Sequence, residues 1–210
     1  MTNSEMKPAA AAASSESDAR AALASAKRVV IKIGTNTITR QKDAPSRISE
    51  GLEDDKGGID VEYLHRVAAE IADLARSGKQ ILLVTSGAVG MGARELGLAK
   101  KPKDTRTRQA CAAIGQPLLM EEYRQAFNVY GLTAAQLLVT RDAWDKRASY
   151  LNLRSTVEAL LERRVVPVFN ENDSVSAAEI AFVNAHQLAA HVASRIVAEP
   201  PVVPTDVACL

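Results

Sequence analysis

The stretch DVEYLHRVAAEIADLARSGKQILLV, residues 60–84, predicts a complete helix followed by a strand. Its apolar residues first recur at helical spacing, with Asp60 placed to cap the first turn and Gly78 just beyond the last. The short apolar run at residues 81–84 then predicts a buried strand. A helix that leads directly into a strand is half of the repeating unit of an α/β protein.

The same alternation extends in both directions from this stretch. Residues 29–33, VVIKI, predict a strand that ends at Gly34. We further expect helices over residues 88–96, 106–130 and 150–163, with a break in the second at Pro117, and strands over 132–140 and 165–169. Two alanines in residues 132–140 leave that segment open to a helix as well. The sequence therefore predicts an α/β domain with a mainly parallel sheet.

Composition narrows the classes of function. The 210 residues include 26 basic and 25 acidic side chains, for a formal net charge of +1. Such a balance argues against a broad surface for nucleic acid or an anionic membrane. No apolar stretch approaches the roughly 20 residues of a membrane span. The two cysteines, Cys111 and Cys209, form neither a disulfide framework nor a metal-ligand motif, so we expect free thiols, no bound metal and a cytoplasmic location.

Two segments differ from the rest of the chain. Residues 1–27 are rich in Ala and Ser and lack aromatic side chains, which predicts a disordered tail before a single domain at residues 28–210. Within that domain, residues 40–58 are polar and contain Pro45 and a Gly57-Gly58 pair. They predict a long flexible loop.

Functional residues are expected at the carboxyl ends of the strands, where parallel sheets bind ligands. Lys32 lies in the first predicted strand, and a lysine there is costly to bury unless it meets an anion. Gly34 and Thr35 follow, and they suit a close approach of the backbone to phosphate. The alternative is an edge strand with Lys32 in solvent.

Two further strand ends carry unusual residues. TSGAVGMG, residues 85–92, places small residues between a strand and a helix, where backbone amides can face an anion, although a tight turn would also explain it. NENDS, residues 170–174, places amides and carboxylates after a strand. That mixture suits an amino acid better than a nucleotide base. The alternative is a polar loop with an aspartate helix cap.

Taken together, these segments resemble one family. VVIKIGTNTIT, ILLVTSGAVGMGARELG, RQACAAIGQPLLMEEYRQAF, QLLVTRDAW and YLNLRSTVEALLERRVVPVFNENDSVSAAEI closely resemble the glutamate 5-kinases, over about residues 28–180. The pairing of VTSGA with NEND is typical of this family rather than of other enzymes with the amino acid kinase fold. The resemblance implies a three-layer α/β/α sandwich whose C-terminal part is incomplete here.

The resemblance also implies an activity. The family transfers the γ-phosphoryl group of ATP, with Mg²⁺, to the side-chain carboxylate of L-glutamate, which is the first step of proline biosynthesis. It further implies a homo-oligomer and proline as a feedback inhibitor.

By resemblance, each family motif gives a role to residues of this chain. Lys32 would contact the phosphoryl oxygens, and Asp173 would bind the ammonium group of glutamate. The other expected nucleotide-binding residues are Gly34, Thr35, Thr205 and Asp206, and the other expected glutamate-binding residues are Ser86, Gly87, Asn170 and Asn184.

The chain departs from the family pattern after about residue 181. Residues 183–186 read VNAH where the family has GDND, so Ala185 replaces a substrate-binding asparagine and His186 an aspartate that organises the active-site lysines. Asn184 could substitute only through a backbone shift. Three prolines interrupt the next expected strand, and the family's later glycine-rich loop and second lysine have no counterpart. The alternative function is therefore an inactive relative that binds glutamate or pairs with a complete subunit.

Overall fold

The computed structural model describes residues 25–34, 60–176 and 185–197. Within these ranges, strands alternate with helices along the chain. The elements are β1 Arg28–Lys32, α3 Val61–Arg76, β2 Gln80–Val84, α4 Ala88–Glu95, α5 Thr105–Asn128, β3 Thr133–Val139, α6 Asp142–Asp145, α7 Arg147–Glu162, β4 Val165–Glu171 and α8 Ala185–Ile196. The predicted tail over residues 1–27 and the predicted loop over 40–58 fall almost entirely outside the described residues.

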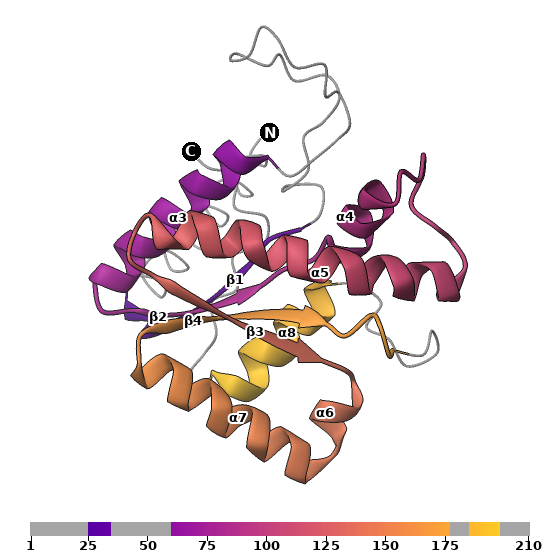
Figure 1. The fold of residues 1–210 in the computed structure, drawn as a ribbon. Helices are drawn as coiled ribbons and strands as arrows, with labels where there is room; N and C mark the ends of the chain where they lie inside the picture. The colour runs from indigo at the N-terminus through magenta and orange to yellow at the C-terminus, as the bar shows by residue number, and fades with distance from the viewer. Residues whose placement is uncertain (1–24, 35–59, 177–184, 198–210) are drawn as a thin grey trace, which may run out of the picture.

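The four strands form one parallel sheet in the order β1-β2-β4-β3. Helices α3 and α5 cover one face of the sheet, and α7 and α8 cover the other (Figure 1). The prediction of a three-layer α/β/α sandwich with a parallel sheet is confirmed. Because every strand runs the same way, all four carboxyl ends meet at one edge of the sheet.

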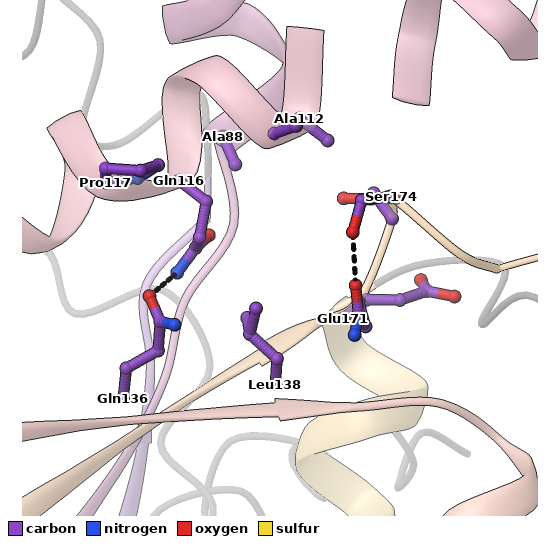
Figure 2. Close-up of a pocket in the computed structure, with 11 residues that line it drawn as sticks. Ala88, Ala112, Gln116, Pro117, Gln136, Leu138, Glu171 and Ser174 are labelled. Carbon is purple, nitrogen blue, oxygen red and sulfur yellow. Dashed lines mark hydrogen bonds between the residues drawn. The ribbon is translucent and has the colours of Figure 1, made fainter. Parts of the chain in front are cut away.

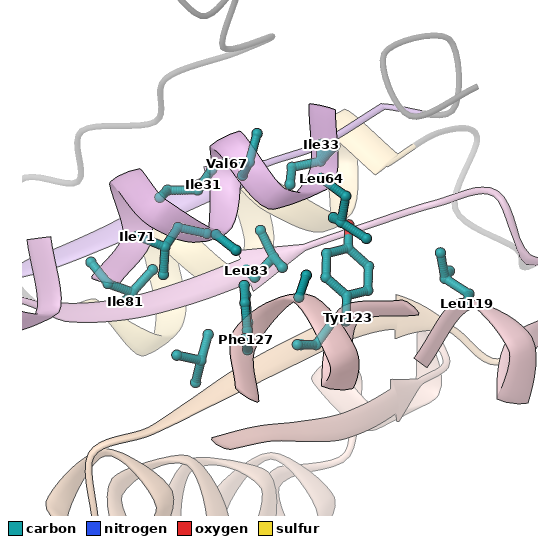
Figure 3. Close-up of a cluster of buried hydrophobic side chains, with 14 of the residues drawn as sticks. Ile31, Ile33, Leu64, Val67, Ile71, Ile81, Leu83, Leu119, Tyr123 and Phe127 are labelled. Carbon is teal, nitrogen blue, oxygen red and sulfur yellow. The ribbon is translucent and has the colours of Figure 1, made fainter. Parts of the chain in front are cut away.

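Alternating side chains of the strands supply two separate cores. Val29 and Ile31 of β1 pack toward α3 and α5, whereas Val30 packs toward α7 and α8. The first core is centred on Tyr123 and Phe127, whose rings lie 5.9 Å apart and which are fully buried (Figure 3). The apolar face of α3 closes it, as the spacing in residues 61–75 predicts. Asp60 caps that helix by accepting a hydrogen bond from the Tyr63 amide.

Two segments, α5 and β3, resolve expectations that the sequence raised. The predicted break at Pro117 is wrong, because α5 continues through it from Thr105 to Asn128. Proline removes only the hydrogen bond that its own amide would donate, to the Ala113 carbonyl, and the buried residues Leu119, Tyr123 and Phe127 hold the rest of the helix against the sheet. Residues 133–139 form a strand rather than a helix, since each of them pairs with β4.

Candidate functional site

A pocket of about 260 Å³ opens at the carboxyl edge of the sheet. Its walls come from the start of α4, the middle of α5, the edge strand β3 and the segment that follows β4 (Figure 2). The lining residues are mainly small apolar groups and polar amides or carboxylates: Ala88, Ala112, Ala113, Gln116, Pro117, Gln136, Leu138 and residues 171–174. A cavity of this size, lined by apolar and polar groups alike, suits a metabolite the size of an amino acid.

Asp173 is the aspartate among the residues that line this pocket. Burial raises its pKa above the ordinary value, while the nearby charges of Arg108 and Lys101 act to lower it. Within the described ranges, no side chain or backbone amide donates a hydrogen bond to this carboxylate. A partly desolvated carboxylate of this kind gains free energy when it receives a cation.

A chain of three side-chain amides forms the inner wall. The Asn170 Nδ2 donates to Gln116 Oε1 at 2.8 Å, and Gln116 Nε2 donates to Gln136 Oε1 at 2.9 Å. Asn170 is 4% exposed and does not line the pocket, so it lies behind the wall that Gln116 and Gln136 present. Direct binding of glutamate by Asn170 stays a prediction.

Lys32 lies at the same edge of the sheet but on its other face. It follows Val30 by two residues and is 5% exposed, so its side chain lies on the face that α8 covers. The Lys32 Nζ is 3.2 Å from the Nε2 of His186, in the first turn of α8. His186, which by resemblance replaces an aspartate, is thus within hydrogen-bond distance of this lysine. Of the two alternatives for Lys32, the structure shows the buried one, although β1 is an outer strand of the described sheet.

Ser86 and Gly87 connect β2 to α4 beside the pocket. Gly87 is the N-cap of α4 with φ 118°, a conformation that favours glycine, and it gives no side-chain cap to the first amides of the helix. The preceding Thr85 is fixed from both sides, since its amide donates to the Phe169 carbonyl and its hydroxyl lies 2.8 Å from the Tyr123 hydroxyl. The predicted tight strand-to-helix connection is present, with its amides at the functional edge.

The structure thus brings the three predicted strand ends together, although they are far apart in the sequence. Asp173 lines the pocket, Asn170 supports its wall, and Ser86, Gly87, Lys32 and the buried Gly34 lie at the same edge. The predicted residues Thr35, Asn184, Thr205 and Asp206 lie outside the described ranges. Sequence reasoning missed Gln116 and Gln136, because one lies inside a helix and the other inside a strand, and neither stands at a strand end.

Residues 25–34, 60–176 and 185–197 contain no group of three or more His, Cys, Asp or Glu side chains that could hold a metal ion. Among the helices in those same ranges, none combines the length and the apolar character needed to cross a membrane.

Comparisons with known proteins agree with this architecture. The sequence profile of the amino acid kinase family matches residues 27–209. The chain is 41% identical over 184 residues to a glutamate 5-kinase of Methanosarcina acetivorans, which covers 86% of this chain and 46% of that protein. It is also 41% identical over 172 residues to a glutamate 5-kinase of Thermus thermophilus, which covers 82% of this chain and 42% of that protein. The chain therefore spans less than half the length of the curated relatives it matches.

Solved structures show the same fold at low sequence identity. An isopentenyl phosphate kinase matches with a TM-score of 0.54 at 20% identity, covering 86% of this chain and 72% of that protein. A Giardia carbamate kinase matches with a TM-score of 0.54 at 14% identity, covering 87% of this chain and 75% of that protein. The profile matches nearly the whole chain, and the fold is a parallel α/β/α sandwich; the chain belongs to the amino acid kinase family.

Proposed function

We propose that this chain takes part in the ATP-dependent phosphorylation of L-glutamate, as a glutamate 5-kinase. An oxygen of the glutamate side-chain carboxylate forms a bond to the γ-phosphorus of ATP. The bond between that phosphorus and the bridging oxygen breaks, and ADP leaves with the electron pair. The product is L-glutamyl 5-phosphate.

The observation that carries this proposal is Asp173 in the pocket. Its carboxylate is partly desolvated, has no hydrogen-bond donor among the described residues and faces a cavity with room for an amino acid. An ammonium group is the natural partner of such a carboxylate. Two relatives named glutamate 5-kinase, each 41% identical, support glutamate as the substrate.

Lys32 is the residue that we assign to the phosphoryl group. Phosphoryl transfer needs positioning and neutralisation of charge more than covalent help from the protein. A buried ammonium at the end of β1 lowers the cost of bringing phosphate oxygens to this edge. The amides at the start of α4, which begins after Gly87, add donors for the same purpose.

The use of ATP follows from membership of the family. The residues present fit a triphosphate, since Lys32 supplies a cation and Gly34 and Gly87 permit close approach of the backbone. Mg²⁺ at such sites keeps water and phosphate oxygens as most of its ligands. We therefore propose that Mg²⁺ enters with ATP and neutralises charge on its phosphates. Proline as an inhibitor and assembly into a homo-oligomer remain predictions from the resemblance.

One observation favours a second candidate function, an inactive relative that binds glutamate or pairs with a complete subunit. The group 3.2 Å from the Lys32 ammonium is the imidazole of His186 rather than a carboxylate. A neutral imidazole can accept a hydrogen bond from an ammonium but supplies no negative charge.

Calorimetric titration with glutamate and with Mg-ATP, followed by an assay of ADP release, separates the two candidates. For the kinase, both ligands bind, ADP forms only with glutamate present, and Lys32→Ala abolishes turnover with little change in the melting temperature. Lys79→Ala is the matched control, because Lys79 lies just before β2, at the amino ends of the strands and away from the carboxyl ends that form the site. Glutamate binding without turnover identifies an inactive relative that binds glutamate. Binding of neither ligand contradicts the kinase and the glutamate-binding relative, and leaves only pairing with a complete subunit.

A further inference from the structure

The three amides behind and within the pocket wall form a chain with a fixed direction. The backbone amide of Glu171 donates to Asn170 Oδ1 at 2.9 Å. A backbone N–H can only donate, so this contact fixes which end of the Asn170 side chain is the oxygen. The Asn170 nitrogen must then face Gln116, which it reaches at 2.8 Å.

The orientation of Asn170 in turn fixes which end of the Gln116 and Gln136 amides is oxygen and which is nitrogen. Gln116 accepts from Asn170 through Oε1, so its Nε2 faces away and donates to Gln136 Oε1 at 2.9 Å. With that oxygen occupied, the remaining group of the Gln136 amide is its Nε2. Figure 2 shows Gln116 and Gln136 projecting toward each other from α5 and β3. Gln136 therefore presents a hydrogen-bond donor at the pocket wall.

Burial makes this direction rigid. Asn170 and Gln116 are 4% and 7% exposed, respectively, so a rotation of either amide would leave a buried donor facing a donor or an acceptor facing an acceptor. A mismatch of that kind costs about 1–3 kcal/mol for each group left without a partner. The orientation of the exposed Gln136 amide is thus set by two buried side chains.

The order of the strands decides which part of an amino acid meets this donor. Lys32 ends β1, the first strand in the order across the described sheet, and Gln136 lies on β3, the last strand in that order. The segment after the central strand β4 carries Asp173 between them. Because the Lys32 side chain lies on the face that α8 covers, the carboxylate that receives the phosphoryl group has to reach across the carboxyl ends of the strands, away from β3, so the α-carbon end of the substrate lies toward β3.

We infer that the Asn170–Gln116–Gln136 chain is a specificity device in which Gln136 Nε2 binds the α-carboxylate of the substrate, while Asp173 binds its ammonium group. Gln136 is the binding residue, and Gln116 and Asn170 are positioning residues that keep the donor turned toward the ligand. The inference rests on the proposed function, since it takes glutamate as the substrate. It adds that the pocket recognises the α-amino acid end through one donor and one acceptor.

Calorimetric titration with two ligands tests this role. L-Glutamate has the α-carboxylate, whereas 4-aminobutyrate lacks it but keeps the amine and the other carboxylate. Loss of a hydrogen bond to a charged group lowers affinity about tenfold or more. We expect Gln136→Leu to lower the affinity for glutamate by that factor. The affinity for 4-aminobutyrate should stay within about twofold of the wild-type value. Gln125→Leu, an exposed glutamine on α5, is the control and leaves both affinities unchanged.

Gln116→Glu tests the direction of the chain. A glutamate there offers only oxygens, so Gln136 has to rotate and donate to it, which turns Oε1 toward the ligand. We expect the affinity for glutamate to fall while the affinity for 4-aminobutyrate is kept, as in Gln136→Leu. Adding Gln136→Leu to Gln116→Glu should lower the affinity for glutamate no further. Gln116→Leu removes the fixing contact without reversing it and gives a smaller loss. Melting curves check that each variant folds. If Gln116→Glu fails to fold, the affinities of Gln136→Leu for the two ligands are sufficient to test the inference.

The outcomes separate this inference from the proposed function. An unchanged ratio of the two affinities in Gln136→Leu overturns the inference, even if the wild type binds glutamate and turns it over. Equal losses for both ligands overturn it too, because they indicate a general effect on the pocket. Selective loss without any turnover supports the inference and contradicts the kinase. No binding of glutamate by the wild type overturns both.

Discussion

At the scale of single residues, the contact between Lys32 and His186 is the feature that most affects chemistry. The lysine is buried, and the Nε2 of an exposed imidazole lies 3.2 Å from its Nζ. A neutral imidazole accepts a hydrogen bond, but a carboxylate would accept a stronger one, because charge-assisted hydrogen bonds are roughly twice as strong as neutral ones. The charge at position 186 therefore bears on how firmly the ammonium is held.

We predict that His186→Asp raises turnover about tenfold, because a carboxylate would hold the Lys32 ammonium in place and lower the cost of its burial. Steady-state measurement of ADP release gives the result. His186→Gln keeps a neutral acceptor and should stay near the wild type. His186 is exposed, so neither change disturbs the core. A lower turnover in His186→Asp would show that position 186 does not act through its charge.

Asp173 makes a second prediction at this scale, on pH. Burial raises the pKa of its carboxyl group, so the group takes up a proton at a higher pH than an ordinary aspartate. Only the ionised form attracts an ammonium group. Glutamate affinity should therefore fall as the pH drops through this raised pKa, before other aspartates titrate. Titrations between about pH 4 and pH 7 would show this, and Asp173→Asn should bind weakly at every pH.

The raised pKa of Asp173 affects folding stability in the opposite direction to glutamate affinity: ionisation favours binding but disfavours folding. A carboxyl group with a raised pKa in the folded state favours folding most when it is protonated, and this contribution is lost as the pH rises through that pKa. Asp173→Asn should therefore melt at a higher temperature than the wild type at pH 7, and this difference should shrink in acid. A variant that loses both binding and stability at pH 7 would mean that Asp173 has a structural role.

At the scale of elements, α4 and α5 pack unusually closely, and both line the pocket. A Cβ added at Gly115 would lie 1.9 Å from the Ala88 carbonyl oxygen, and one added at Gly92 would lie 1.8 Å from that of Cys111. Contacts so short are with backbone atoms, which cannot rotate away. The two glycines therefore let the helices approach, and this approach places Ala88 of α4 opposite Ala112 and Gln116 of α5 in the pocket wall.

We predict that Gly115→Ala destabilises the chain by about 1–3 kcal/mol or more, because the added methyl group forces α4 away from α5. Gly90→Ala is the matched control on α4, since a Cβ there meets nothing within 4 Å. It should leave stability unchanged or raise it by about 0.5–1 kcal/mol through higher helix propensity. Urea denaturation measures both, and equal midpoints for the two variants would contradict the packing argument.

At the scale of the whole molecule, parallel strand order creates the site. Lys32, Gly87 and Asp173 are separated by long stretches of sequence, yet each follows or ends a strand of one parallel sheet. The sheet therefore brings them to its carboxyl edge. Helix α5 lines one wall of the pocket, and α8 carries His186, which contacts Lys32. The described residues account for the candidate pocket and for one buried lysine at the carboxyl edge.

Local patterns were sufficient for most of the fold. The helical spacing and caps of residues 60–78, the β-branched run at 29–33 and the alternation of the two periods predicted the elements and their parallel arrangement. They also predicted that Lys32 and Asp173 would stand at strand ends, but they left open whether Lys32 is buried or solvated. These features depend on residues close together in sequence, whose propensities and periodicity act before any distant contact forms.

Tertiary structure alone decided the rest. Pro117 stays inside α5 because buried side chains on both sides of it pack against the sheet, which no local rule can weigh against a missing hydrogen bond. Residues 133–139 are a strand because β4 lies beside them. The amide chain from Asn170 through Gln116 to Gln136 joins three elements, and its direction depends on contacts between residues 20 and 54 positions apart. Such contacts arise only when the folded sheet brings those elements together.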